Sequence, residues 1–257
     1  AESERLQRLV QRHGARLGAA RFVAGETLDS CVAVLRRLND AGLYANTTLL
    51  GEAIRDAEGA AAVTAAYETI IERLVAEGLR ANVALKLTHL GLSFDEELAY
   101  ENVARLVARA GELETFVRID MEQSEYVEVT LRIYERLRDA GHDAVGTVLQ
   151  SYLYRTPDDL ERLLPRTPNL RLVKGAYLEP ASIAYPEKAD VDRAYLELVE
   201  RGLRGGAYIA VATHDEAIIR AVQAFAAREG IPRDRFEFQM LYGVRPALQR
   251  SIAAEGY

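Results

Sequence analysis

Short apolar runs and longer amphipathic segments alternate along most of the chain. The runs are rich in strand-forming residues, whereas the segments between them repeat their apolar residues at helical spacing. Seven runs predict β-strands, at residues 44–50, 81–87, 115–121, 144–150, 169–175, 208–214 and 236–241. The intervening segments predict helices, among them 60–78, 95–112, 125–141 and 215–230. Such alternation is typical of a parallel sheet built from βαβ units.

The predicted strands are apolar enough for burial on both faces, which favours a barrel over an open sheet. No G-x-G-x-x-G follows the first strand, so the main signature of a dinucleotide-binding open sheet is missing. The pattern therefore predicts an α/β protein, a (β/α)8 TIM-type barrel over residues 43–257. The sequence stops at Tyr257, where an eighth strand and helix should begin. We expect this barrel to be C-terminally incomplete, with its eighth βα unit missing.

Residues 1–42 predict a helical arm that precedes the barrel. Its apolar residues recur at helical spacing in two groups, Leu6, Leu9, Val10 and Leu17, then Leu28, Val32, Leu35 and Leu38. The only cysteine, Cys31, falls within the second group, and we expect it to be a buried core thiol. A single cysteine excludes an intrachain disulfide and a cysteine-built metal site.

Composition adds limits on the class of protein. Hydrophobic residues make up 49% and charged residues 28% of the chain, as in ordinary globular proteins. A formal net charge of −7, with 32 Lys and Arg, argues against a general nucleic-acid surface. No apolar run is long enough to cross a membrane, and no signal-peptide core is present at the N-terminus. We therefore expect a cytoplasmic protein.

Polar residues recur at the C-terminal ends of successive predicted strands. They are Lys86, Asp120, Gln150, Arg171, Lys174, Thr213, His214, Gln239 and Tyr242. A single strand-end lysine or aspartate is usually a solvated loop residue, and His214 could merely flank a helix N-cap at Asp215. In a barrel, however, these strand ends form the active face. Their recurrence on six successive strands predicts a site on this rim.

The charges on the rim indicate what the site binds. Lys86, Arg171 and Lys174 are cationic, whereas Asp120 is the one inward carboxylate. Such a balance suits an anionic substrate, an anionic cofactor or both. The four histidines are scattered, so we expect no metal site, and no G-x-S-x-G marks a serine nucleophile.

Five motifs occur in order along the chain: TTLLGE, IDME, RLVKGAY, VATHD and FEFQMLYG. Together they resemble the proline dehydrogenase family over about residues 43 to 250. That family consists of FAD-dependent (β/α)8 barrels, alone or as the first module of bifunctional proline-utilisation enzymes. The resemblance implies oxidation of L-proline to Δ1-pyrroline-5-carboxylate, the first step of proline catabolism. A hydride would pass from proline C5 to flavin N5, and the electrons would go on to a quinone-type acceptor.

The resemblance also implies roles for individual residues. Asp120 and Arg171 match the catalytic positions. Lys86 matches the lysine that pairs with the proline carboxylate, and Tyr177 and Leu241 match positions that line the substrate pocket. Positions toward the FAD are Met121, Gln150, Arg171, Val173, Lys174, Gly175, Ala176, Thr213, His214 and, toward its phosphates, Lys188.

This sequence departs from the family at its C-terminal end. The family's last helix carries two adjacent arginines that supply most of the clamp on the substrate carboxylate, and no such helix is present here. We therefore expect weaker proline binding than with that helix. Peripheral contact with the inner face of a membrane is left open.

Two other functions fit the same residues. A Schiff-base aldolase could use a strand-end lysine, Lys174 or Lys86, as its nucleophile. A non-catalytic barrel could instead bind a small anion on its cationic rim. Borohydride trapping with a keto substrate would reveal the aldolase, whereas flavin absorbance would fit neither alternative.

Overall fold

The computed structural model describes residues 23–51 and 54–257. Seven parallel strands form one sheet in chain order, which confirms the seven predicted strands. They are β1 (Ala45–Thr47), β2 (Ala81–Leu85), β3 (Val117–Ile119), β4 (Val145–Gln150), β5 (Asn169–Val173), β6 (Tyr208–Ala212) and β7 (Phe236–Gln239). β1 is shorter than expected, and none of its residues is buried, because it lies at an edge of the sheet.

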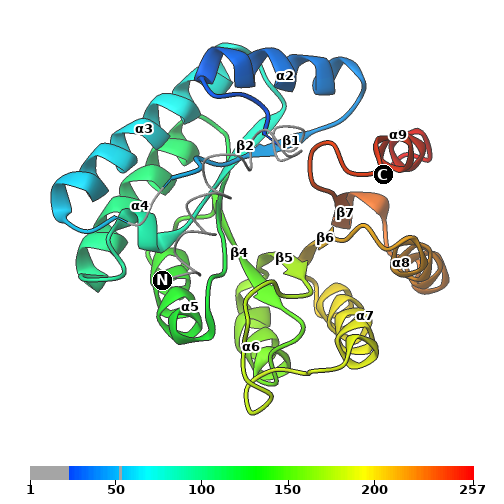
Figure 1. Ribbon diagram of the computed structural model, residues 1–257. Coiled ribbons are helices and arrows are strands. Elements are labelled where there is room, and N and C mark those ends of the chain that lie inside the picture. Colours follow the sequence, from blue (N-terminus) through cyan, green and yellow to red (C-terminus); the bar gives the residue numbers. More distant parts are fainter. Residues whose placement is uncertain (1–22, 52–53) are drawn as a thin grey trace, which may run out of the picture.

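Helices connect the strands and cover the outside of the curled sheet (Figure 1). The α-helices are α2 (Leu28–Asp40), α3 (Ala57–Ala76), α4 (Glu96–Glu112), α5 (Ser124–Asp139), α6 (Thr156–Leu163), α7 (Lys188–Arg204), α8 (Glu216–Glu229) and α9 (Pro246–Ala254). Short 3₁₀ helices are η2 (Leu87–Leu90), η3 (Leu164–Arg166) and η4 (Arg233–Arg235). The four helices predicted by residue range are therefore confirmed as α3, α4, α5 and α8.

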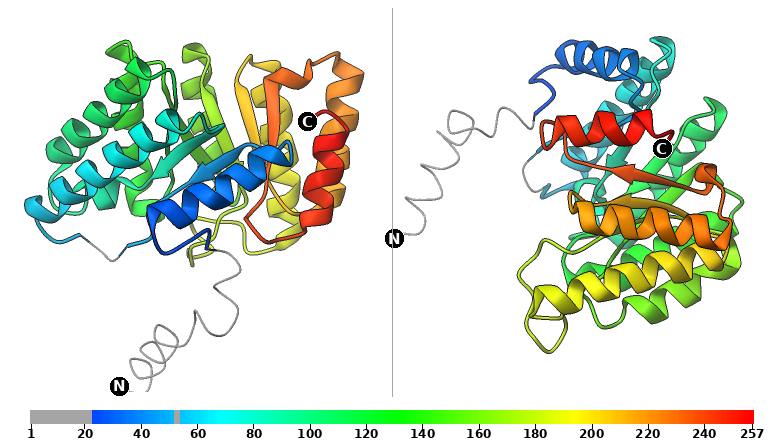
Figure 2. Two further views of the ribbon diagram at one scale, coloured as in Figure 1. Left: turned by 90° about the horizontal axis from the view of Figure 1, so that it is seen from above. Right: turned by 90° about the vertical axis from the view of Figure 1, so that its right-hand side faces the viewer.

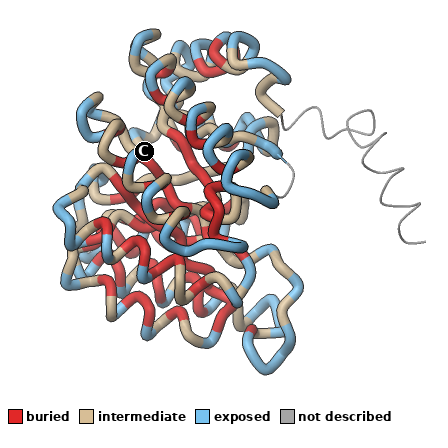
Figure 3. Tube along the Cα trace, turned by 90° about the vertical axis from the view of Figure 1, so that its left-hand side faces the viewer, coloured by how far each residue is buried: buried red, intermediate tan, exposed pale blue. Residues whose placement is uncertain are grey.

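The apolar side chains between sheet and helices form the core. Outward-facing strand residues such as Leu85, Ile119 and Leu172 are fully buried against the helices. Figure 3 shows the buried residues along the strands and on the helix faces turned toward them. The prediction of an α/β barrel fold is confirmed as a parallel, curled half-barrel of seven strands, with β1 and β7 at its edges in the described chain.

Two helices lie beside these edges (Figure 2). α2 begins with a reciprocal capping box between Thr27 and Ser30, and it contacts β1. α9 packs through Leu248 and Ile252 against α8. The predicted first helix of the N-terminal arm, with Leu6 to Leu17, lies outside the described residues.

The prediction for Cys31 is only partly right. Cys31 packs against the core but is half-buried, with its Sγ 3.6 Å from the Thr47 Oγ1. The reason is that α2 covers the short edge strand β1, where less of the helix can be enclosed. Within residues 23–51 and 54–257, no helix is both long and apolar enough to cross a membrane.

The strand register decides which side chains reach the barrel interior. Arg171 is the Cα partner of Val148 on β4 and of Ala210 on β6, and Arg118 is the partner of Gly146. In-register neighbours of a parallel sheet point to the same face. Because side chains alternate along a strand, Asp120 projects inward with Arg118.

Candidate active site

Arg171 is the centre of a hydrogen-bond network at the C-terminal mouth of the half-barrel. Its Nη1 donates to Asp120 Oδ1 at 2.6 Å and its Nε donates to Gln239 Oε1 at 2.6 Å. Its Nη2 donates to Asn46 Oδ1 at 2.9 Å. One guanidinium on β5 therefore links β1, the residue that follows β3, and the last residue of β7, and each of its three nitrogens has an acceptor.

The Arg171–Asp120 ion pair is largely removed from water. The two side chains are 12% and 24% exposed. Burial raises the pKa of Asp120, while the positive charges of Arg171, Arg118 and Lys86 act in the opposite direction. A pair of this kind is costly to break, because the remaining charge stays buried without its partner.

Lys86 differs from Arg171 in having no carboxylate partner among the described residues. It is half-buried just beyond β2, and none of the described carboxylates lies within 4.0 Å of its ammonium. Its charge nevertheless acts on Asp120 and Glu122. Tyr177 lies in the same region, since burial raises the pKa of its hydroxyl and the charges of Glu122 and Asp120 act in the same direction. Lys86 is therefore available to an anion at the mouth.

Lys174 and Lys188 lie close together, as expected for residues that contact the same ligand. Their positive charges, however, are compensated by nearby carboxylates. Lys174 Nζ lies 2.5 Å from Asp192 Oδ1 and 3.4 Å from Asp215 Oδ2. Lys188 pairs with Asp192 and lies 3.7 Å from Asp215. Although burial disfavours its charged form, the two ammonium groups hold the pKa of Asp192 below its ordinary value. The inference that Asp120 is the one carboxylate facing the cations is therefore wrong, because α7 and the start of α8 supply two more.

Gln150 provides a buried polar atom that lacks a partner. The residue is 3% exposed, and its Nε2 donates to the carbonyl oxygen of Glu122 at 3.2 Å. Its Oε1 has no hydrogen-bond partner among the described residues. An unsatisfied buried acceptor is costly, so this oxygen suits a donor from a bound ligand. Val173, at the end of β5, is the Cα partner of Gln150, and Met121 is a buried residue that follows β3 by two positions.

The backbone just after Lys174 requires a glycine. Gly175 has φ +120°, and a Cβ there would lie 2.3 Å from the ring of Tyr152. The next residue, Ala176, is exposed. A larger side chain at Gly175 would displace Tyr152 and change the course of this loop.

Thr213 and His214 are held by β7 and by the start of α8. The Thr213 Oγ1 accepts from the Asp215 backbone N–H at 3.1 Å, and Asp215 is the N-cap of α8, as expected. His214 Nε2 accepts from the Leu241 backbone N–H at 2.9 Å, so its proton is on Nδ1. Burial lowers the pKa of His214, and the charge of Arg245 acts in the same direction. Leu241 stands at the mouth with its side chain 65% exposed.

Three residues that the sequence analysis did not single out belong to this site or support it: Asn46, Arg118 and Glu122. Arg118 is buried and donates to the Thr147 and Asn169 carbonyl oxygens at 3.1 and 2.9 Å. Burial lowers its pKa to about 10, and the charge of Arg171 acts in the same direction. A cation inside an apolar strand was the signal that identified Arg171, and it applies equally to Arg118.

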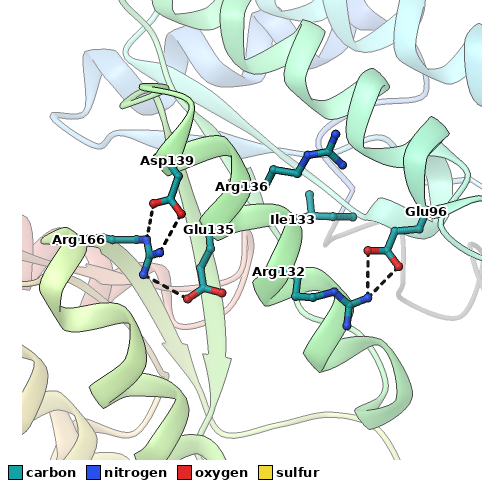
Figure 4. Close-up of a pocket in the computed structure, with 7 residues that line it drawn as sticks. All are labelled: Glu96, Arg132, Ile133, Glu135, Arg136, Asp139 and Arg166. Atoms are coloured by element: carbon teal, nitrogen blue, oxygen red, sulfur yellow. Dashed lines mark hydrogen bonds and ion pairs between the residues drawn. The ribbon is translucent and has the colours of Figure 1, made fainter.

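A separate cavity of about 400 Å³ lies on the outer side of α5 (Figure 4). Its cations are already paired, Arg132 with Glu96 and Arg166 with Asp139. It therefore offers no uncompensated charge and lies away from the strand ends. Within the described ranges, no three His, Cys, Asp or Glu side chains come together as a metal site would require.

The family model for proline dehydrogenase matches residues 31–257 of this chain. Proline dehydrogenase 1 of Bacillus subtilis subsp. natto is 40% identical over 257 residues, which are all of this chain and 85% of that relative. Proline dehydrogenase of Deinococcus radiodurans is 45% identical over 243 residues, 93% of this chain and 78% of the relative.

A solved structure supports the fold independently. Proline utilization A (PutA) from Bdellovibrio bacteriovorus superposes with a TM-score of 0.88 at 23% identity, over 98% of this chain and 31% of that one. Family model, sequence relatives and fold agree with the resemblance read from the motifs. The chain belongs to the proline dehydrogenase family, oxidoreductases that act on proline.

Proposed function

We propose that residues 43–257 oxidise L-proline to Δ1-pyrroline-5-carboxylate with FAD as cofactor, and that the electrons pass to a quinone-type acceptor. The observation that carries this proposal is the arrangement at the mouth. A desolvated Arg171–Asp120 pair lies beside Lys86, the cation that has no carboxylate partner among the described residues. Membership of the proline dehydrogenase family supplies the substrate.

Lys86 is the group best placed to receive the proline carboxylate. The residue is half-buried and pairs with no carboxylate of the described residues, so an arriving carboxylate would displace none of them. Tyr177 and Leu241 would enclose the ring, since both stand at the mouth. Holding the carboxylate at one end fixes the orientation of the ring and hence the position of C5.

The residues present fit a flavin. The Gln150 Oε1, which has no partner in the described part of the chain, can accept from a ring N–H, and the glycine at position 175 keeps the loop close to Tyr152. When bound, FAD would accept at N5 the hydride that leaves proline C5. The residues that would hold it are Met121, Gln150, Arg171, Val173, Lys174, Gly175, Ala176, Thr213 and His214, with Lys188 toward the phosphates.

Arg171 and Asp120 act as a unit in this proposal. A preorganised cation such as the Arg171 guanidinium would stabilise the negative charge that develops on the electron acceptor beside it. Asp120 fixes the guanidinium through its 2.6 Å contact. No hydrogen bond joins Asp120 to Lys86, so we assign Asp120 to positioning Arg171.

Absorbance spectroscopy of the purified protein tests the proposal. We expect a flavin spectrum, with the released cofactor identified as FAD by mass, and bleaching when L-proline is added without oxygen. Trapping of the product with o-aminobenzaldehyde and reoxidation by a soluble quinone complete the test. Protein that carries no flavin after reconstitution with FAD, or flavin that L-proline does not bleach, would contradict it. D-proline is the matched control for substrate geometry.

Schiff-base chemistry at Lys174 receives no support from the geometry. The Lys174 ammonium is paired with Asp192 and with Asp215, and an amine held in this way is not free to attack a carbonyl.

A further inference from the structure

Glu122 is a buried carboxylate to which the proposed reaction assigns no role. It follows β3 by three residues and is 5% exposed. Burial raises its pKa, and the hydrogen bonds from Thr88 act in the opposite direction. The Thr88 Oγ1 donates to Glu122 Oε2 at 2.6 Å, and the Thr88 backbone N–H donates to Oε1 at 3.2 Å. Both carboxylate oxygens are therefore held by one residue.

The position of Thr88 gives this contact its importance. Thr88 is the second residue of η2, and Lys86 is the N-cap of that helix. The Lys86 side chain makes no capping hydrogen bond, so the first N–H groups of η2 need an acceptor from elsewhere. Glu122 supplies it from the end of the neighbouring strand. The turn that carries Lys86 is thereby fixed to β3.

Glu122 is also bonded to β4, the strand on the other side of β3. Its carbonyl oxygen accepts from Gln150 Nε2 at 3.2 Å, and this bond fixes the amide whose Oε1 has no partner in the described chain. Asp120 lies two residues earlier on the same segment. The ends of β2, β3 and β4 thus meet at Glu122, which lies between the residue proposed for the substrate carboxylate and one proposed for the flavin.

We propose that Glu122 is a positioning residue for the oxidation of proline. It fixes Lys86 relative to Asp120 and so sets the affinity for small cyclic α-carboxylates without contacting them. This inference rests on the proposed function, because it takes Lys86 as the partner of the substrate carboxylate.

Glu122→Gln tests the idea with little change of shape. One oxygen remains, but the new NH₂ group cannot accept from Thr88. Because loss of this charge-assisted hydrogen bond loosens the turn that carries Lys86, we expect tetrahydrofuran-2-carboxylate to bind roughly tenfold more weakly. The FAD content should stay within about twofold of wild type. Binding is followed by the shift in flavin absorbance and by calorimetry, which does not depend on the flavin.

Matched changes at Thr88 separate positioning from simple destabilisation. Thr88→Ser keeps the hydroxyl and should bind the analogue as wild type does. Thr88→Val keeps the branched shape but removes the donor, and it should show part of the Glu122→Gln loss. Equal affinities for Thr88→Val and Thr88→Ser would overturn the proposal, as would a Glu122→Gln protein that loses FAD and the analogue in the same proportion.

A double-mutant cycle with Lys86→Met distinguishes a positioning role of Glu122 from a purely structural one. If Glu122 acts through Lys86, adding Glu122→Gln to Lys86→Met should weaken the analogue by no more than about twofold further. A full additional loss overturns the inference. A Lys86→Met effect without any Glu122→Gln effect also overturns it but leaves the proposed function intact. An unchanged affinity in Lys86→Met would instead contradict the proposed substrate site itself.

Discussion

Arginine–carboxylate pairs occur in two very different settings in this molecule. On the outer side of α5, Arg132 bonds both oxygens of Glu96 at 3.0 and 2.8 Å, and each side chain is 49% exposed. At the barrel mouth, Arg171 bonds Asp120 at 2.6 Å, with the two side chains 12% and 24% exposed. The chemical groups and the distances are similar, so water is what distinguishes the two pairs.

This difference determines what each pair can do. Water screens an exposed pair, which contributes about 0–1 kcal/mol to stability. A desolvated pair interacts strongly but keeps its charges only while both partners are present. The exterior pairs therefore add a little to the packing of α4 against α5, whereas the interior pair fixes a guanidinium at the proposed active site.

The largest expected effect on stability follows removal of the interior cation. Arg171→Met leaves Asp120 without its ion-pair partner. Because the Asp120 side chain is only 24% exposed, we expect the free energy of unfolding to fall by about 2–4 kcal/mol. Asp120→Asn in the same chain removes the stranded charge and should restore part of this loss. Chemical denaturation measures both. A double variant no more stable than Arg171→Met would mean that the Asp120 charge is solvated.

Lys86 should affect ligand binding rather than stability. We expect Lys86→Met to bind tetrahydrofuran-2-carboxylate at least about tenfold more weakly, with a smaller loss of FAD, because a carboxylate is its proposed partner. Lys188→Met is the matched control, since Lys188 is 73% exposed and already paired with Asp192. It should alter FAD affinity more than analogue affinity. If Lys86→Met mainly weakened FAD binding and Lys188→Met mainly weakened analogue binding, the two assigned roles would be reversed.

His214 should add a pH dependence to stability. Its folded-state pKa lies below that of a free histidine, so protonation favours the unfolded chain. The stability it contributes is present above about pH 6.5 and is lost as the pH falls through the folded-state pKa. His214→Asn should therefore lose less stability than wild type between about pH 7.5 and about pH 5.5. If the denaturation midpoint shifts equally with pH in both proteins, His214 does not titrate in this range.

The smallest effect is expected on the exterior. Arg132→Met should lower the free energy of unfolding by less than about 1 kcal/mol and leave the flavin spectrum unchanged. Thermal unfolding monitored by circular dichroism is sufficient to measure this. A loss as large as that in Arg171→Met would mean that desolvation is not what separates the two pairs.

Most of the fold could be predicted because burial leaves a strong periodic signal. The apolar runs identified all seven strands. Edge positions were harder, since β1 and the Cys31 segment of α2 are only half enclosed. Their residues are as apolar as those of a core element, and only the tertiary arrangement decides how much water they keep.

The site could be predicted only where a strand end marked it. Asp120, Lys86 and Arg171 follow from that rule. The pairing of Lys174 with Asp192 and Asp215 does not, because helix residues far along the chain bring those carboxylates in. Glu122 stands within the IDME motif, yet its proposed role depends on a contact with Thr88 that no spacing rule gives.

The rate of flavin reduction by L-proline, measured side by side in two arginine variants, tests the central claim most directly. Loss of a preorganised electrostatic contact costs about 10²–10³ in rate, so Arg171→Met should be reduced at least about a hundredfold more slowly than wild type. Arg132→Met, which loses an equally well-formed but solvated pair, should be reduced within about twofold of the wild-type rate. An Arg171→Met protein that retains FAD and is reduced as fast as Arg132→Met would contradict the account.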